Sequence, residues 1–280
     1  MNPLKKYSNF LKIEHSLFSL PLLFAGALMA KASWPSLKET LLILMAGGCA
    51  RIVALVLNRI IDRKIDALNP RTQDRHLVSG KMKLWEAGIL GLLALVVYLF
   101  ASWSLSEFCL KLSWIPLIGF AAYPYFKRIT KWTHVGLGIV WAMIPIAGHL
   151  AVKPSFEGSL PSFTLALFSI FWLAGFDIIY ATMDEEVDRQ TGVKSLPSAW
   201  GAQRALKMAS IFHFWAFVIL VLFYGFFLSG PLTVLSLGVV GILLFAEHRM
   251  ASDVNLAVFH INTIIGFVVL LMVMSGIKGI

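Results

Sequence analysis

Acidic side chains gather at two places in this largely apolar chain. One cluster holds Asp62 and Asp66 within residues 58–66, and the other holds Asp184 and Asp188 within residues 184–188. Each follows a long apolar stretch and opens a polar loop. Since 58% of the residues are hydrophobic and only 14% are charged, acidic groups at a membrane face are costly unless they bind something. The two clusters therefore predict one or more bound divalent cations.

The spacing of these residues places them on common helix faces. Asn58, Asp62 and Asp66 recur every four residues, and Arg51 precedes Asn58 by seven. If the helix continues through the motif, their Cβ atoms lie about 5–6 Å apart in one stripe. A second stripe repeats the pattern at intervals of seven and four: Asp177, Asp184 and Asp188.

The residue types around the clusters suit a diphosphate held through Mg²⁺. Carboxylate and amide oxygens are hard donors, and Mg²⁺ usually takes one or two carboxylates and leaves positions for substrate phosphate. Basic side chains that can neutralise phosphate oxygens follow both clusters or end a neighbouring apolar stretch: Arg71, Arg75, Lys127, Arg128 and Lys194.

A structural interpretation competes with this one. A single Asp at a helix end is usually a cap or a solvated loop residue. Asp177 differs, because it lies about two turns inside an apolar stretch, where a charge costs about 2.5–3.5 kcal/mol. Arg51 carries the same argument, although an Arg51–Asp salt bridge within the bundle would be purely structural.

The elements that must position these groups are membrane helices. Mean hydropathy is +0.79 over 280 residues, and backbone polar groups in lipid need internal partners. The sequence predicts an all-α, multispanning membrane protein, with about nine transmembrane helices in one bundle around a central cavity. The apolar stretches of spanning length are roughly residues 16–33, 37–57, 85–104, 108–126, 134–152, 160–181, 205–228, 230–246 and 255–277.

The charge pattern predicts an orientation. Most of the 24 Lys and Arg residues fall on the N-terminal segment and on alternate loops that include both acidic clusters. By the positive-inside rule this face and the N-terminus are cytoplasmic, and an odd number of spans puts the C-terminus outside. The net charge of +9 therefore reflects topology, contact with anionic lipid and an anionic substrate, and no nucleic-acid partner is expected.

Other chemistries find little support. Cys49 and Cys109 lack CxxC spacing and are interpreted as small buried residues. The sequence contains no zinc motif, no phosphate-cradling GxxxxGK[ST] and no GxSxG elbow. His149 and His260 are interpreted as packing residues, and residues 205–280 as scaffold in which Glu247-His248-Arg249 and Asp253 form a solvated loop.

Three motifs resemble the UbiA family of intramembrane prenyltransferases. The first signature is similar to Asn58-Arg59-x-x-Asp62-x-x-x-Asp66 followed by Asn69-Pro70-Arg71-Thr72 and Arg75. The second resembles residues 177–188 continuing to Gly192-Val193-Lys194-Ser195, and residues 123–128 resemble the segment ending helix 4. Many members carry Asp where this chain has Arg59, and a subgroup resembling quinone-pathway enzymes carries Asn-Arg there.

This resemblance implies a single prenyltransferase domain over residues 1–280. The implied reaction transfers an isoprenoid chain from an allylic polyprenyl diphosphate to a hydroxylated aromatic acid, 4-hydroxybenzoate or a dihydroxynaphthoate, in ubiquinone or menaquinone biosynthesis. Mg²⁺ would be held by Asn58, Asp62, Asp66, Asp184 and Asp188. The diphosphate would be neutralised by Lys12, Arg71, Arg75, Lys127 and Lys194.

The acceptor and the prenyl cation leave several candidates. Arg51, Arg128 and His15 could meet the acceptor's carboxylate, and Asp177 and Tyr180 could contact the aromatic substrate. The candidates for cation-π contact are Trp141, Phe171, Trp172 and Phe176. We expect an integral protein of a bacterial inner membrane, with the lipid bilayer and both substrates as partners.

Two alternative functions remain open from the sequence. One is a UbiA-type prenyltransferase for another acceptor, such as a haem, a chlorophyllide or a glyceryl phosphate lipid. The other is an ion-coupled transporter, because transporters also carry intramembrane carboxylates and internal repeats. A transporter predicts acidic residues near the bilayer midplane, whereas these lie mainly at one face.

Overall fold

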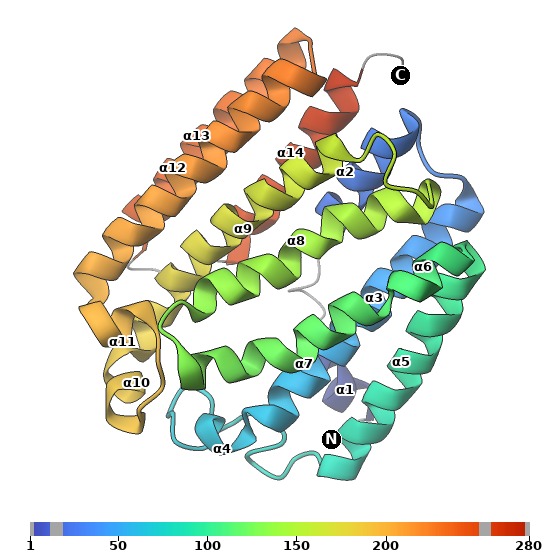
Figure 1. The fold of residues 1–280 in the computed structure, drawn as a ribbon. Coiled ribbons are helices and arrows are strands. Elements are labelled where there is room, and N and C mark those ends of the chain that lie inside the picture. The colour runs from blue at the N-terminus through green and yellow to red at the C-terminus, as the bar shows by residue number, and fades with distance from the viewer. Residues whose placement is uncertain (1–2, 12–18, 252–258, 278–280) are drawn as a thin grey trace.

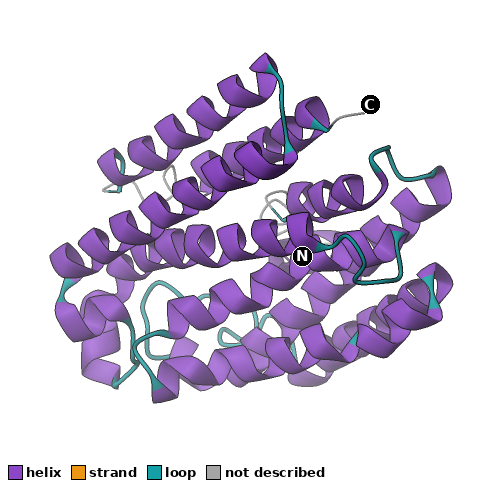
Figure 2. Ribbon diagram, turned by 45° about the horizontal axis from the view of Figure 1, so that its top comes forward, coloured by secondary structure: helices purple, strands orange, loops and turns teal. Residues whose placement is uncertain are grey.

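The computed structural model describes residues 3–11, 19–251 and 259–277, and every regular element in these ranges is a helix (Figure 2). The helices of the first half are α1 (Pro3–Leu11), α2 (Leu20–Lys31), α3 (Leu37–Ile61), α4 (Arg63–Asp66), α5 (Leu84–Leu105), α6 (Glu107–Leu112) and α7 (Trp114–Ile129). Those of the second half are α8 (Thr133–Val152), α9 (Leu160–Ala181), α10 (Glu185–Thr191), α11 (Leu196–Trp200), α12 (Ala202–Phe227), α13 (Pro231–Arg249) and α14 (Asn262–Gly276).

The membrane class is confirmed, but the count of nine spans is not. Seven helices in the described ranges are long and apolar enough to cross a membrane: α3, α5, α8, α9, α12, α13 and α14. The other two predicted spans correspond to shorter helices, α2 with 12 residues and α7 with 16.

The stretch predicted as one span over 108–126 is two helices. Ser106 caps α6, accepting a hydrogen bond from the Cys109 amide (3.0 Å). The chain breaks at Ser113, whose hydroxyl donates to the Leu110 carbonyl (2.7 Å) while its own carbonyl accepts from Tyr98 (3.1 Å). These side-chain hydrogen bonds satisfy backbone groups that a helix end exposes, which apolarity alone cannot reveal.

The long helices pack against one another in a continuous order. α5 packs on α3, α3 on α7, α7 on α8, α8 on α9 and α9 on α12 (Figure 1), while α13, α14 and α2 complete the circuit back to α8. The largest apolar cluster surrounds α9, with Phe168, Trp172 and Leu173 at its centre. The packing around α9 therefore fixes the positions of Asp177 and Tyr180 near its C-terminal end.

The short helix α2 is held by direct backbone contact with α8. A Cβ added at Gly26 would lie 1.9 Å from the Pro145 carbonyl oxygen, and one added at Gly148 would lie 1.8 Å from the Leu23 oxygen. Only glycine permits this approach, which is a common way for membrane helices to gain packing energy.

The prediction of a solvated loop at Glu247–Arg249 is wrong. Glu247 belongs to α13 and is 0% exposed. The Asn262 amide donates to Glu247 Oε1 (2.9 Å) and accepts from Trp172 Nε1 (2.6 Å), and His213 Nδ1 lies 3.8 Å from Glu247 Oε2. The sequence stretch looked polar, but its carboxylate is turned inward among α9, α12 and α14. Asp253 lies outside the described residues.

Replacing Asn262 tests this buried network. In Asn262→Leu, Trp172 Nε1 and Glu247 Oε1 lose their partner, and we expect a loss of about 1–3 kcal/mol in the free energy of unfolding. Unfolding of the detergent-solubilised protein followed by tryptophan fluorescence measures it. Thr263→Val is the control, because within the described residues the Thr263 hydroxyl hydrogen-bonds only the Phe259 carbonyl one turn back. Equal stability of the two variants would contradict a structural role for the network.

Candidate functional site

The first acidic cluster keeps the predicted stripe across a break in the helix. α3 ends at Ile61 and α4 begins at Arg63. The chain stays close to helical there, because the Asp62 amide donates to the Asn58 carbonyl (2.9 Å) and the Asp66 amide to the Asp62 carbonyl (2.8 Å). Asn58 Nδ2 consequently donates to Asp62 Oδ2 at 3.0 Å.

Asp62 is buried between two basic residues of α7. It is 1% exposed, with Lys127 Nζ 2.6 Å from Oδ2 and an Arg128 nitrogen 3.3 Å from Oδ1. Burial raises the pKa of the Asp62 carboxyl, and the charges of Lys127 and Arg128 oppose that shift.

Asp66 is paired through the loop that follows it. Arg75 NH1 lies 2.7 Å from Asp66 Oδ1, and Thr72 donates to the Asp66 carbonyl at 2.8 Å. Asp66 Oδ2 is buried and has no hydrogen-bond partner in the described ranges. A buried carboxylate oxygen without a partner is costly, so this atom marks a place where a cation would be stabilised.

Asp184 of the second cluster is bound by the loop of the first. Asn69 donates to Asp184 Oδ1 (2.7 Å), and Arg71 grips both carboxylate oxygens, with its Nε 2.9 Å from Oδ1. Arg71 NH1 also donates to the Tyr180 hydroxyl. Burial alone would lower the pKa of Arg71, but Asp184 and Tyr180 outweigh it and hold that pKa above its usual value. The two clusters thus form one site.

Asp188 and Lys194 lie on the opposite side of this site. The Ser195 hydroxyl donates to Asp188 Oδ2 (3.0 Å). The Lys194 amide donates to the Lys127 carbonyl (2.7 Å), and Lys194 Nζ donates to the Ile129 carbonyl (3.1 Å). The chain before α11 is therefore fastened to the end of α7.

Asp177 has a partner that sequence reasoning missed. His134 Nδ1 lies 2.7 Å from Asp177 Oδ2, and His134 is 1% exposed at the start of α8. The available signal was a histidine at the loop end of an apolar stretch that follows the basic 127–131 segment. Asn69 and Tyr123 also line the polar cavity, but the sequence assigns them no role beyond membership of their motifs.

These groups surround one polar cavity of about 160 Å³. It is lined by all five predicted metal ligands, by Asp177 and Tyr180, and by four of the predicted diphosphate-binding residues: Arg71, Arg75, Lys127 and Lys194. Lys12 and His15 lie outside the described residues.

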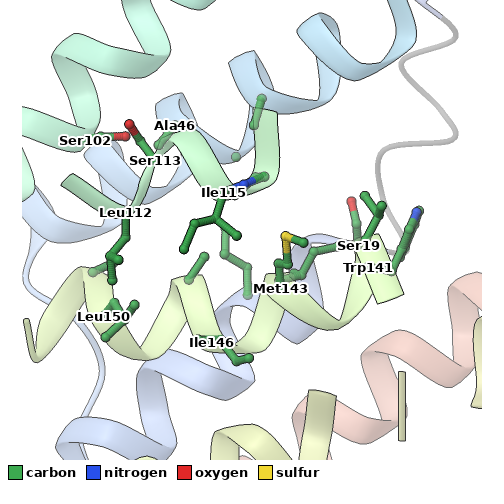
Figure 3. A pocket seen from close by; sticks show the side chains of 18 of the residues that line it. Ser19, Ala46, Ser102, Leu112, Ser113, Ile115, Trp141, Met143, Ile146 and Leu150 are labelled. Atoms are coloured by element: carbon green, nitrogen blue, oxygen red, sulfur yellow. The ribbon is translucent and has the colours of Figure 1, made fainter. Parts of the chain in front are cut away.

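A larger apolar cavity of about 430 Å³ adjoins the polar one. Figure 3 shows Met143, Ile146 and Leu150 of α8 facing Leu112 and Ile115 across it. Tyr123 lines both cavities. A ligand with a charged head and a hydrocarbon tail fits the pair.

The remaining basic residues near the first cluster differ in which cavity, if any, they line. Arg51 lines the apolar cavity rather than the polar one. Arg128 lines neither cavity and instead hydrogen-bonds the Pro124 and Ile61 carbonyls beside Asp62. Arg59 also lines neither, and its NH1 is buried without a hydrogen-bond partner in the described part of the chain.

Of the aromatic candidates, only Trp141 lines the apolar cavity. Trp172 and Phe176 are packed in the core around α9, and Phe171 packs against Phe212. His149 is a satisfied packing residue as expected, with Ser155 and Ser162 as partners.

The carboxylates suit a metal site that water and substrate phosphate complete, rather than one formed by protein side chains alone. Within the described ranges, no group of three or more His, Cys, Asp and Glu side chains is arranged to hold a metal ion alone. Yet the cavity offers hard oxygen donors and the unpartnered Asp66 Oδ2. That donor set suits Mg²⁺, which keeps several positions for water and substrate phosphate.

An all-helical membrane bundle with a cavity of acidic and basic side chains next to an apolar cavity defines a membrane protein suited to an amphiphilic anionic ligand. The profile of the UbiA prenyltransferase family matches residues 19–274, so the chain belongs to this family. The predicted domain boundaries, residues 1–280, stay a prediction.

Similar proteins agree with this assignment. The chain is 28% identical over 264 residues to a 4-hydroxybenzoate octaprenyltransferase of Shewanella denitrificans, covering 89% of this chain and 84% of that protein. The apo structure of a UbiA homologue from Aeropyrum pernix is 30% identical, with a TM-score of 0.83 over 92% of this chain and 96% of that one. A UbiA homologue from Archaeoglobus fulgidus, bound to GPP and Mg²⁺, shares the fold at 20% identity, with a TM-score of 0.68 over 96% of this chain and 99% of that one.

Arg71→Gln tests the link between the two clusters. It leaves Asp184 with Asn69 alone, and we expect about 1–3 kcal/mol of lost stability in the substrate-free protein. Arg189→Gln is the matched control, because Arg189 pairs with Glu185 and Glu186 on an exposed face of α10, where such pairs contribute about 0–1 kcal/mol. Chemical denaturation in detergent compares them, and equal losses would show that Arg71 does not join the clusters.

Proposed function

We propose that this prenyltransferase moves a polyprenyl chain from an allylic polyprenyl diphosphate to a hydroxylated aromatic acid, with 4-hydroxybenzoate as the acceptor. The observation that carries the proposal is the shared wall at Tyr123, where a cavity of paired acids and bases meets an apolar cavity. The names of the relatives support this acceptor over a dihydroxynaphthoate.

The basic residues of the polar cavity bind the diphosphate. Arg71, Arg75 and Lys127 are neutralised by carboxylates when no substrate is bound. A diphosphate offers these side chains, together with Lys194, new anionic partners. When the allylic C–O bond breaks, the leaving diphosphate gains negative charge, and these cations stabilise it in place.

The acidic residues face the same diphosphate through a metal. Asn58, Asp62, Asp66, Asp184 and Asp188 are the residues that would hold Mg²⁺, which supplies positive charge to the diphosphate when bound. In the substrate-free site the basic residues pair with the carboxylates. When both ligands are bound, the basic residues would pair with the diphosphate and the carboxylates with the metal.

The apolar cavity accommodates the hydrocarbon chain and excludes water from the allylic cation. Its walls are aliphatic and aromatic along α8, and Trp141 offers a ring face to a cation. The electron-rich acceptor ring then attacks the allylic carbon. Arg51, the basic residue among the lining of this cavity, is the proposed counter-charge for the acceptor's carboxylate, whereas Arg128 serves Asp62.

The protein is an integral membrane protein, and we propose the bacterial inner membrane as its location. The polar cavity, the N-terminus and the loops around α4, α10 and α11 would face the cytoplasm, and the C-terminus would lie outside. The excess of basic residues on these loops supports this orientation.

Metal removal and an acceptor panel test the function. Membranes containing the protein, given farnesyl diphosphate and Mg²⁺, are expected to prenylate 4-hydroxybenzoate, and EDTA is expected to abolish the product until Mg²⁺ is restored. Mass spectrometry of the prenylated product measures both. Transfer only to dihydroxynaphthoate, a haem, a chlorophyllide or a glyceryl phosphate lipid would overturn the proposed acceptor, and no transfer to any acceptor would overturn the function.

Two isosteric substitutions test the acidic clusters. Asp62→Asn and Asp184→Asn each remove charge without changing volume, and we expect turnover to fall by at least about 10²-fold, because charge at the diphosphate is lost. Glu157→Gln is the control, since Glu157 is exposed and lines neither cavity. Product formation at matched levels of folded protein is the measurement, and near wild-type rates in either cluster variant would refute the assigned roles.

A further inference from the structure

The acceptor ring must lose a proton after the new carbon–carbon bond forms, and the roles above assign no group to receive it. The acceptor reacts where the two cavities meet, beside Tyr123. Five carboxylates line the polar cavity together with Tyr123: Asp62, Asp66, Asp177, Asp184 and Asp188. Asp177 is the one among them that stands outside the proposed metal site.

The hydrogen bonds of His134 indicate which nitrogen of its neutral ring carries the hydrogen. The Leu196 amide donates to His134 Nε2 (3.3 Å), so Nε2 carries a lone pair. In the neutral ring the hydrogen is therefore on Nδ1, which donates it to Asp177 Oδ2 at 2.7 Å. The imidazole holds one carboxylate oxygen in place and cannot itself accept a proton at Nδ1.

The second oxygen of Asp177 is left for chemistry. Asp177 lines the polar cavity, its side chain is 22% exposed, and Oδ1 makes no hydrogen bond within the described ranges. His134 also lines this cavity, but it is only 1% exposed. The segment that positions His134 also contacts the second acidic cluster. Leu196, whose amide bonds His134, is the first residue of α11, and the preceding Ser195 donates a hydrogen bond to Asp188.

We propose that Asp177 is the base that removes the ring proton from the prenylated acceptor, and that His134 is a positioning residue that orients it. The C–O bond to diphosphate breaks, the allylic carbon bonds to the ring carbon, and the C–H bond at that carbon then breaks. Its electron pair restores the aromatic ring, and its proton passes to Asp177 Oδ1. The protonated carboxyl returns the proton to water after product release.

This inference rests on the proposed aromatic acceptor, and a ring-deuterated acceptor tests it. Purified protein is assayed with farnesyl diphosphate, Mg²⁺ and 4-hydroxybenzoate that carries hydrogen or deuterium beside the hydroxyl group. Asp177→Asn is expected to lower kcat by about 10²–10⁴-fold, to leave the KM for farnesyl diphosphate within about threefold, and to acquire a primary deuterium isotope effect larger than that of the wild type. Near wild-type kcat, or a loss of kcat without a larger isotope effect, would overturn the assignment.

His134 variants separate positioning from packing. His134→Asn keeps an amide N–H near the position of Nδ1 and is expected to stay within about tenfold of the wild-type kcat, whereas His134→Ala is expected to lose more, about 10²-fold, because a misplaced group costs that much. His149→Asn is the matched control, a buried histidine of the same helix outside both cavities, and is expected to change neither kcat nor the isotope effect. Equal losses in the Asn and Ala variants of His134 would refute the positioning role.

The remaining outcomes keep the test decisive. If Asp177→Asn does not accumulate as folded protein, Asp177→Ala is used, and near wild-type turnover, or a loss of kcat without an enlarged isotope effect, overturns the proposal. Wild-type transfer to 4-hydroxybenzoate with an unaffected Asp177→Asn removes the base alone and leaves the proposed function intact. No aromatic transfer by the wild type removes both.

Discussion

Each of the five carboxylates that line the polar cavity is paired with, or hydrogen-bonded by, a side chain from outside its own helix. Asp62 is held by α7, Asp66 by Arg75, Asp184 by the 69–71 loop, Asp188 by Ser195 and Asp177 by α8. Burying such charges singly would cost several kcal/mol each. The loops after α3 and α9 therefore cannot fold independently, and their joint closure creates the cavity.

This constraint also prepares the site for its ligand. A site of bare carboxylates would repel an anionic diphosphate, and a site of bare basic residues would repel a cation. Paired charges do neither, and they let both arrive through an exchange of partners. Arg71 illustrates the point, because the residue that joins the two clusters is also a proposed phosphate ligand. Substrate binding would thus loosen the contact that holds the empty site together.

Residue type and spacing predicted much of the lining of the polar cavity, because a four-residue interval on a helix has a fixed geometry. Asp177 was also found, since a charge inside an apolar stretch is conspicuous. The sequence did not single out His134, and it wrongly predicted that Glu247 is solvated. The burial of these side chains depends on distant residues that contact them, Leu196 for His134 and Asn262 for Glu247. Among the aromatic residues, Trp141 and Trp172 look alike in the sequence and differ only in which neighbour they meet.

The close contact between α2 and α8 makes the two sides of the apolar cavity unequal in evolution. At Gly26 and Gly148 any larger residue collides with backbone, so the spacing between α2 and α8 is fixed. The facing wall carries small residues on α3: Ala46, Ala50 and Ala54. Each of these can gain atoms one step at a time. The apolar cavity can therefore change its shape by mutation on the α3 wall without disturbing the contact between α2 and α8.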